Sequence, residues 1–171
     1  LISNSSRPCI LLGGGIRISK SISKVHRLLS YFDIPILTTW SGLDSIGHDH
    51  KNYIGTVGVY GSRAANFTIQ NSDLVLNLGS RLDTRITGGK PSTFAREAKV
   101  ISVDIDKNEI LKKRGLKIYD YFNCDLNIFL DNFNKLLNKK IKKQFWLEKC
   151  HKWRKDFPIL KGDDITQKKF V

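Results

Sequence analysis

The sequence predicts an α/β protein with a Rossmann-like, doubly wound and mostly parallel sheet that carries helices on both faces. Short, near-continuous apolar runs recur along the chain, and amphipathic helical periods separate most of them. Such runs are typical of strands buried on both faces, and strands joined through helical crossovers pair in parallel. Glycines end two of these runs, at Gly13 and Gly79. The predicted order is β-α-β-α-β, a connection with no assigned element, and then β-α-β-α.

The first strand is expected at Pro8–Leu12, where every residue is apolar. A helix should follow, because apolar residues recur at steps of four and three, at Ile18, Ile22, Val25, Leu29 and Phe32. A second strand is expected at 35–38, where the proline presets the backbone. A Gly-rich passage then covers 39–61, and Ser62 can cap a helix that ends near Asn71.

Three more strands are expected, at Leu74–Leu78, Val100–Ile105 and Ile118–Phe122. Asp106 and Glu109 resemble a capping box that opens a short helix to Arg114.

Asp125 caps a helix whose apolar side should hold Ile128, Phe129, Phe133, Leu136 and Leu137. Beyond Leu137 we expect a Lys-rich linker and a last helix with Trp146 and Trp153.

The composition bounds the class of protein. A chain of 171 residues with 40% hydrophobic content suits one domain. No run approaches the roughly 20 apolar residues of a membrane span, and the N-terminus lacks the order of a signal peptide. The three cysteines form no CxxC pair, so we expect reduced thiols, no zinc ribbon and a cytoplasmic protein. Because the chain contains no Met, we expect it to be a fragment of a longer protein.

The net charge of +13 invites a nucleic-acid hypothesis, but its distribution argues against one. Residues 135–155 contain nine Lys or Arg and one Glu, nearly all the cations are Lys, and few aromatics are interleaved. Surfaces that bind nucleic acid usually combine Arg with aromatic side chains. The pattern indicates a solvated helix.

Ligands of parallel α/β sheets bind beyond the carboxyl ends of the strands, so the residues that follow each predicted strand are the candidates. They are Gly13, Gly14 and Gly15; Thr38, Thr39 and Gly42; Gly79, Ser80, Arg81, Asp83 and Arg85; Asp104 and Asp106; Cys124 and Asp125.

The three glycines would let a phosphate approach the backbone, although a tight turn without a ligand explains them too. Position 18 is Ile, so the GxGxxG fingerprint is absent, and Asp33 precedes its strand; both disfavour a standard NAD site. Arg81 and Arg85 offer planar donors suited to a diphosphate, the other interpretation being a surface loop in which Arg81 pairs with Asp83.

Asp104 is the candidate for binding ribose hydroxyls, while Asp106 is more simply a helix cap. His48 and His50 are interpreted as exposed loop residues rather than a metal pair, and no metal site is predicted. Cys124 is interpreted as a small buried apolar residue rather than a nucleophile.

These residues together resemble the central domain of thiamine-diphosphate-dependent enzymes, in the acetolactate (acetohydroxyacid) synthase group. The resemblance covers about residues 7–137 and lies in five segments of specific order and spacing. They are ILLGGG at 10–15, PILTTWSGLDSIGHDHKNYIGTVGVYG at 35–61, AANFTIQNSDLVLNLGSRLDTRITGG at 64–89, FAREAKVISVDIDKNEI at 94–110 and CDL at 124–126.

The resemblance implies a six-stranded Rossmann-like sheet that holds FAD, ADP or no nucleotide. Carried over residue by residue, the nucleotide contacts would be Gly14, Gly15, Thr39, Trp40, Gly79, Ser80, Arg81, Asp83, Arg85, Ile86, Asp104, Ile105, Asp125 and Leu126. The chain departs from the family where Val59-Tyr60-Gly61 replaces Met-His-Gly and where Leu82-Asp83-Thr84-Arg85 replaces Phe-Asp-Asp-Arg.

The resemblance also implies that thiamine diphosphate and magnesium are bound only by the full-length protein, through separate pyrimidine- and pyrophosphate-binding domains. Lys161-Gly162-Asp163-Asp164 does not match the family's metal motif. We therefore expect residues 1–137 to be a nucleotide-binding central domain without catalytic residues. Residues 138–171 would be a basic linker and C-terminal helix leading to a missing domain.

The full-length protein would be a homo-oligomeric lyase or transferase acting on C–C bonds next to a carbonyl. A non-enzymatic assembly module with an empty, degenerate site is the alternative. A deacylase related to sirtuins, and a basic nucleic-acid binder, are further hypotheses that the residues favour less.

Overall fold

The computed structural model describes residues 1–111 and 115–159, and it confirms the predicted fold class. Six parallel strands form one sheet in the order β4-β3-β1-β5-β6-β7. The strands are β1 (Pro8–Leu12), β3 (Ile36–Thr38), β4 (Tyr53–Thr56), β5 (Leu74–Leu78), β6 (Lys99–Asp104) and β7 (Asp120–Asn123). A separate ladder pairs β2 (Phe32–Asp33) with β8 (Ile141–Lys142).

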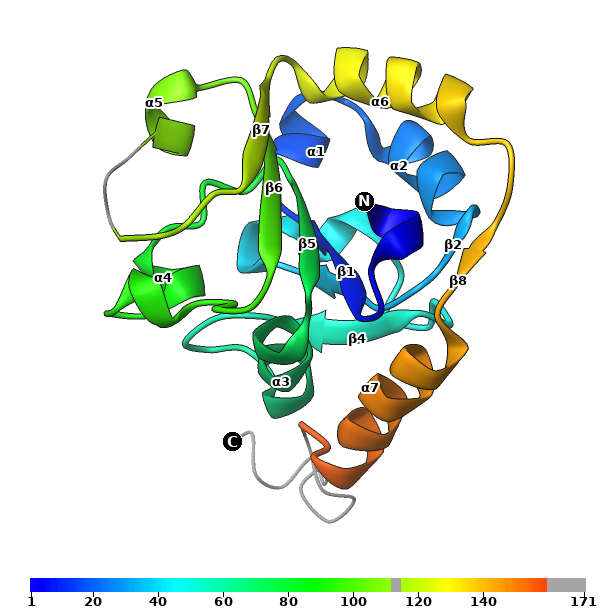
Figure 1. Cartoon of the computed structure of the whole chain (residues 1–171), viewed down its shortest axis with the longest axis vertical. Helices are drawn as coiled ribbons and strands as arrows, with labels where there is room; N and C mark the ends of the chain where they lie inside the picture. The colour runs from blue at the N-terminus through cyan, green and yellow to red at the C-terminus, as the bar shows by residue number, and fades with distance from the viewer. Residues whose placement is uncertain (112–114, 160–171) are drawn as a thin grey trace, which may run out of the picture.

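Helices cover both faces of the sheet (Figure 1). The helices α2 (Ile22–Leu29) and α6 (Leu126–Leu136) lie on one face, and α3 (Arg63–Asn71) and α7 (Gln144–Asp156) on the other. Three short helices, α1 (Gly15–Ile18), α4 (Thr84–Thr87) and α5 (Lys107–Leu111), lie in the connections. The 3-10 turns are Ile2–Asn4, Trp40–Ser45 and Pro91–Thr93.

The central strand β1 shows how one apolar run supplies two cores. Successive side chains of a strand point to opposite faces of the sheet. Ile10 and Leu12 therefore pack with α2 and α6, while Cys9 and Leu11 pack with α3 and α7. Both faces of β1 are buried, which is why its sequence contains no polar residue.

The strand order reverses between β1 and β5. From β1 the chain crosses to β3 and β4 on one side, whereas β5 leads to β6 and β7 on the other. The connections that leave β1 and β5 therefore diverge at their carboxyl ends. This is the place where open α/β sheets bind ligands.

Several predicted elements are confirmed residue by residue. The bounds of β1 and β5 agree with the predicted ones. Ser62 caps α3, because its Oγ accepts a hydrogen bond from the backbone N–H of Ala65 at 3.2 Å. The sixth strand, β4, lies inside the Gly-rich passage, so only the family resemblance implied it.

The predicted helix from Ile18 to Phe32 is wrong in extent. The chain forms two helices there, separated at Lys20, whose φ is +55°. Ile18 is 84% exposed rather than part of the buried stripe, and Phe32 belongs to β2.

The predicted apolar side of α6 is also partly wrong. Phe129 and Leu130 are buried, but Ile128 and Leu136 face solvent. Fewer of the apolar residues of α6 are therefore buried against the sheet than the sequence predicted.

The capping box at Asp106 is half formed. The Asp106 carboxylate accepts the N–H of Asn108 at 2.8 Å, but the N–H of Asp106 itself donates to Asp104. The predicted end of this helix at Arg114 lies outside the described residues.

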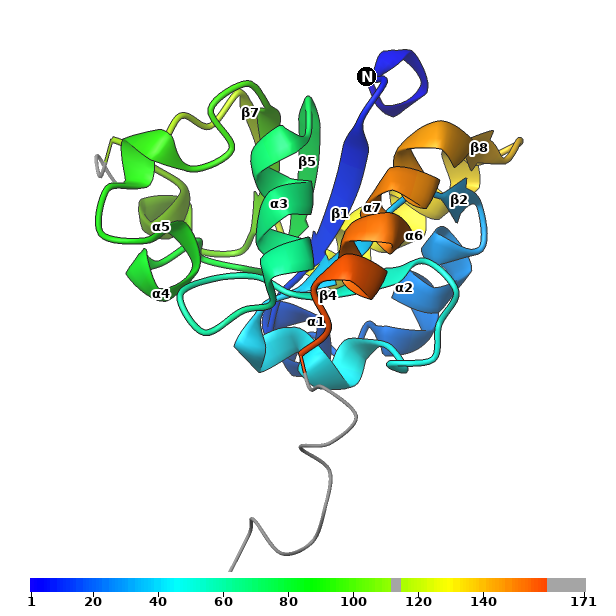
Figure 2. The same cartoon turned by 90° about the horizontal axis from the view of Figure 1, so that it is seen from below.

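The C-terminal segment packs on the same body as the rest of the chain. Helix α7 lies beside α3 (Figure 2) and buries Trp146, whose indole N–H donates to the Pro8 carbonyl at 3.1 Å. The Arg154 guanidinium donates to the Tyr53 carbonyl at 2.7 Å. The division after residue 137 stays a prediction. Among the described helices, none is long and apolar enough to cross a membrane.

Candidate functional site

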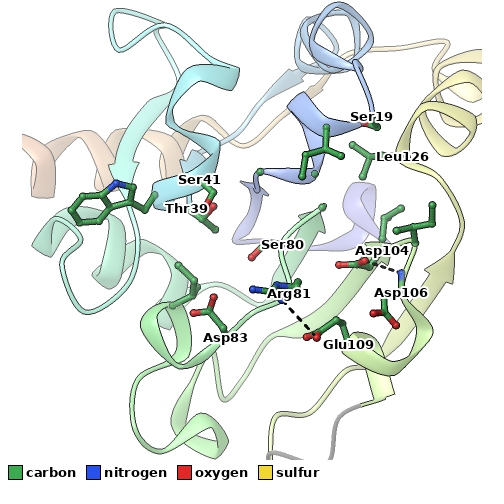
Figure 3. A pocket seen from close by; sticks show the side chains of 18 of the residues that line it. Ser19, Thr39, Ser41, Ser80, Arg81, Asp83, Asp104, Asp106, Glu109 and Leu126 are labelled. Atoms are coloured by element: carbon green, nitrogen blue, oxygen red, sulfur yellow. Dashed lines mark hydrogen bonds and ion pairs between the residues drawn. The ribbon is translucent and has the colours of Figure 1, made fainter.

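One large pocket opens at the carboxyl end of the sheet. Its cavity volume is about 870 Å³, close to the upper end of the roughly 300–1,000 Å³ typical of small-molecule sites. All fourteen residues that the resemblance implies as nucleotide contacts line it. Figure 3 shows Thr39 and Ser41 on one side of this pocket and Asp104 and Asp106 on the other.

The glycines after β1 are explained by close packing of two loops. A Cβ on Gly13 would lie 2.3 Å from the carbonyl oxygen of Gly79, and one on Gly15 would lie 2.9 Å from the Gly79 Cα. The N–H of Gly15 donates to the Gly79 carbonyl at 2.9 Å. Gly14 and Gly15 line the pocket, whereas Gly13 is not among the lining residues. A tight turn therefore accounts for these glycines whether or not a phosphate binds.

The loop after β5 is held by side chains buried beneath it. Asn77 donates through Nδ2 to the Ser80 carbonyl at 2.6 Å and to Ser102 Oγ at 2.8 Å. Gly79 adopts a φ of +66°, a region that glycine enters without steric cost. The backbone that presents Ser80 and Arg81 to the pocket is therefore fixed from below.

Arg81 and Arg85 are the two cations among the lining residues. Arg81 does not pair with Asp83; its Nη1 lies 3.9 Å from Glu109 Oε1, and its side chain is 65% exposed. Asp83 instead caps α4 by accepting the N–H of Arg85 at 2.8 Å. The surface-loop interpretation with an Arg81–Asp83 pair is not the arrangement that the structure describes.

The ends of β6 and β7 form the acidic side of the pocket. Asp104, Asp106, Glu109 and Asp125 line it there. Asp104 Oδ1 accepts the N–H of Asp106 at 3.0 Å, and Asp125 caps α6 by accepting the N–H of Asn127 at 2.8 Å. The capping role predicted for Asp125 is confirmed.

The opposite side carries an apolar rim. Trp40 and Tyr60 meet edge to face with their ring centroids 6.0 Å apart, and they are 65% and 74% exposed. Ile18 and Ile105 also line the pocket while largely exposed, although Ile105 directly follows β6 and so lies at the acidic end. Exposed apolar side chains gathered at a cavity mark an interaction site.

Some lining residues were not among the candidates from the sequence. They are Ile18, Ser19, Ser41, Val57, Tyr60, Val103 and Glu109. Val57 and Tyr60 follow β4, so recognising that strand would have placed them at the sheet end. Conversely, the candidates Thr38 and Gly42 do not line the pocket: Thr38 bonds to Tyr53, and Gly42 packs against the Leu12 carbonyl.

Cys124 lines the pocket and is half-buried, and burial raises the pKa of its thiol. Burial also raises the pKa of Cys9 and of Cys150 to about 12. His48 is exposed and stacks on Tyr53, as predicted, but His50 is half-buried and its Nδ1 accepts the N–H of Asn52 at 3.2 Å, so the prediction that it is exposed is wrong. Within the described residues, no three His, Cys, Asp or Glu side chains form a cluster able to hold a metal ion.

Comparison with known proteins identifies the family. A model described as "Thiamine pyrophosphate enzyme, central domain" matches residues 1–123. The chain belongs to the thiamine pyrophosphate enzyme central domains. The acetolactate synthase large subunit of Cyanidium caldarium is 36% identical over 163 residues, covering 93% of this chain and 28% of that protein.

Two further relatives show a similar degree of likeness. The acetolactate synthase isozyme 2 large subunit of Escherichia coli (strain K12) is 33% identical, over 96% of this chain and 29% of its own length. The probable acetolactate synthase large subunit of Methanocaldococcus jannaschii is 36% identical, over 100% of this chain and 29% of its own length. The chain thus spans less than a third of the relatives it matches. Lys161-Gly162-Asp163-Asp164 lies beyond the residues that the family model matches and outside the described residues.

Proposed function

We propose that this chain is the nucleotide-binding central domain of a larger, thiamine-diphosphate-dependent enzyme similar to acetolactate synthase. The observation that carries the proposal is the convergence of all fourteen implied contacts on one pocket at the point where the strand order reverses. The chain alone supplies no catalytic residue in this proposal; it binds FAD or ADP and joins two catalytic domains.

The pocket divides the proposed ligand into three parts. Arg81 and Arg85 would bind the diphosphate, because guanidinium groups donate to phosphate in pairs. Asp104 would accept hydrogen bonds from the ribose hydroxyls. Trp40 and Tyr60 would contact a second ring system, which ADP lacks and FAD has. From β3 to β6 the sheet spans three strand spacings, or about 14 Å, which suits an extended nucleotide.

The full-length protein would act on C–C bonds next to a carbonyl, as a lyase or transferase. Thiamine diphosphate supplies the carbanion for that chemistry when it is bound, together with magnesium, by the pyrimidine- and pyrophosphate-binding domains. We further propose that the full-length enzyme is a homo-oligomer in the cytoplasm. Three free cysteines among the described residues fit a reducing compartment.

The test is a binding series on the 171-residue chain with ADP, FAD, NAD and thiamine diphosphate. A ligand at about 100 times its Kd adds about 2.7 kcal/mol, and about 2–4 °C per kcal/mol is expected at this size. A melting-temperature rise of about 5–10 °C with ADP or FAD, and none with thiamine diphosphate, is the expected result. Cys124 offers a second readout, since a bound nucleotide should slow its alkylation while Cys9 and Cys150 stay buried.

One observation favours a second candidate, an assembly module with an empty site. The described lining contains five carboxylates against two guanidiniums, and Arg81 faces Glu109. The glycines are also explained by loop packing alone. No thermal response and no protection of Cys124 by any nucleotide would favour this module over the nucleotide-binding domain.

A further inference from the structure

The two ends of the pocket differ in charge. The lining at the β3 and β4 end comprises Thr39, Trp40, Ser41, Val57 and Tyr60, none of which carries a charge. At the β6 and β7 end, four carboxylates line the pocket: Asp104, Asp106, Glu109 and Asp125. A ligand that spans the pocket therefore meets a strongly acidic wall at one end only.

Among the described residues that line the pocket, Arg81 is the one cation near that wall. It already has two interaction partners, a carboxylate of the wall and, in the proposed function, the diphosphate. It lies 3.9 Å from Glu109, so part of its charge offsets that carboxylate. In the proposed function its remaining donors face the diphosphate. No lining cation is left over to receive a second phosphate beside Asp104 within the part of the chain that the structure describes.

Asp104 is held in place by the backbone around it. Its carbonyl accepts the N–H of Cys124 at 3.2 Å, and its Oδ1 accepts the N–H of Asp106 at 3.0 Å. No described residue donates to Oδ2, the second oxygen of this carboxylate. An ionised carboxylate only accepts hydrogen bonds, so a fixed and available oxygen favours hydroxyl donors and repels phosphate.

We infer that this pocket selects adenine nucleotides whose ribose carries free 2′- and 3′-hydroxyls and rejects those with a phosphate at either position. The inference rests on the proposed function, because it assumes that the adenosine end lies against Asp104. It assigns Asp104 as the specificity-determining residue. Nucleotides of the NADP and coenzyme A type, which carry such a phosphate, are excluded from the site.

The experiment compares ADP with adenosine 2′-phosphate 5′-diphosphate and adenosine 3′-phosphate 5′-diphosphate, by calorimetry on the 171-residue chain. Each pair differs by one phosphate, so the ratio of Kd values isolates its effect. We expect the phosphorylated forms to bind at least about tenfold more weakly, because a like charge placed against a carboxylate is strongly unfavourable.

Asp104→Asn separates charge from shape. Asparagine keeps an oxygen that can accept the Asp106 N–H, but it removes the negative charge. The ratio should then fall to about threefold or less. Asp131→Asn is the matched control, since Asp131 is an exposed residue of α6 paired with Lys24 and does not line the pocket. It should leave the ratio unchanged.

The salt dependence of the Kd ratio distinguishes charge repulsion from a steric clash, because a steric clash does not depend on ionic strength. Raising the ionic strength from about 0.1 M to about 1 M shortens the Debye length from about 10 Å to about 3 Å, so the ratio should shrink in the parent chain. Equal affinity for ADP and its phosphorylated forms, or a ratio that ignores both Asp104→Asn and salt, overturns the inference while the proposed function stands. If neither ADP nor FAD binds, the proposed function and the inference fall together.

Discussion

The close approach of the loops after β1 and β5 predicts a graded response to alanine at four glycines. In Gly13→Ala the new Cβ would lie 2.3 Å from the Gly79 carbonyl oxygen, 0.7 Å inside the 3.0 Å below which real Cβ contacts essentially never occur. The atom in the way belongs to the backbone, so no side chain can turn aside. The two loops must therefore move apart.

The cost follows from the bonds that this movement would stretch. Gly13 donates to Leu78 and Gly15 donates to Gly79, both at 2.9 Å, and a shift of 0.7 Å along them would leave both beyond hydrogen-bonding range. Each such bond is worth about 1 kcal/mol, and the lost packing adds about 1 kcal/mol. Alanine returns about 0.4–1 kcal/mol by restricting the unfolded chain. We expect Gly13→Ala to destabilise the fold by about 2 kcal/mol.

Two other glycines separate this steric effect from backbone strain. Nothing lies within 4 Å of a Cβ on Gly88 or Gly89, but Gly88 has a φ of +80°. Gly88 combines this φ with a ψ of 178°, a region essentially restricted to glycine, so Gly88→Ala should cost about 1–3 kcal/mol, whereas Gly89→Ala should cost nothing. Gly79→Ala combines a φ of +66° with a 2.9 Å contact to Gly15, so it should cost at least as much as Gly13→Ala.

The assay is urea unfolding followed by circular dichroism, with thermal melts beside it. About 2 kcal/mol corresponds to a melting temperature about 4–8 °C lower at this chain length. The free energies of unfolding of Gly13→Ala and Gly89→Ala are then compared. If they differ by less than about 0.5 kcal/mol, which is typical of surface substitutions, the two loops are not in the contact described and the reasoning fails.

Three further predictions concern binding, pH and packing. Arg85→Ala should weaken ADP or FAD at least about tenfold in calorimetry, and unchanged affinity would remove its assigned role. Burial lowers the pKa of His50 and of His151, so the unfolded chain binds protons at a higher pH than the folded chain does. The urea concentration at the unfolding midpoint should therefore decrease as the pH is lowered from 7 to 5. His50→Gln should make that decrease smaller. A pH-independent midpoint would contradict this. Trp146→Phe leaves the buried Pro8 carbonyl without its donor, so it should cost about 1–3 kcal/mol in urea unfolding, and a cost near zero would mean that the bond is not formed.

Burial on both faces made much of the sheet predictable from the sequence. Strands β1 and β5 are buried along their whole length, so their apolar runs marked them with correct ends. The edge strand β7 is exposed throughout, and its predicted start was two residues early. Strand β4 was missed because its sequence contains Gly55, whose φ of +149° suits the close contact with Ser62. That pattern is typical of a loop.

The pocket was predictable to the extent that its residues follow strands. Gly79 and Arg81 follow β5 and Asp104 ends β6, so the strand ends predicted them as neighbours, and they line one cavity. Ser41 and Glu109 reach the same cavity from a 3-10 turn and from α5. Their positions depend on how those turns fold back over the sheet, which no local period encodes.

The bond between Trp146 and Pro8 joins residues 138 positions apart, and Lys143 reaches Ser3 across 140. During synthesis β1 leaves the ribosome long before α7, so one face of the sheet stays without the cover that α7 provides until residues 144–156 have been made. Contacts of such sequence separation slow folding, because a long loop must close before any of them forms. During that interval the apolar residues of α3 and β1 that later pack against α7 are accessible to other chains, and such exposed surface promotes aggregation. Docking of α7 covers this surface.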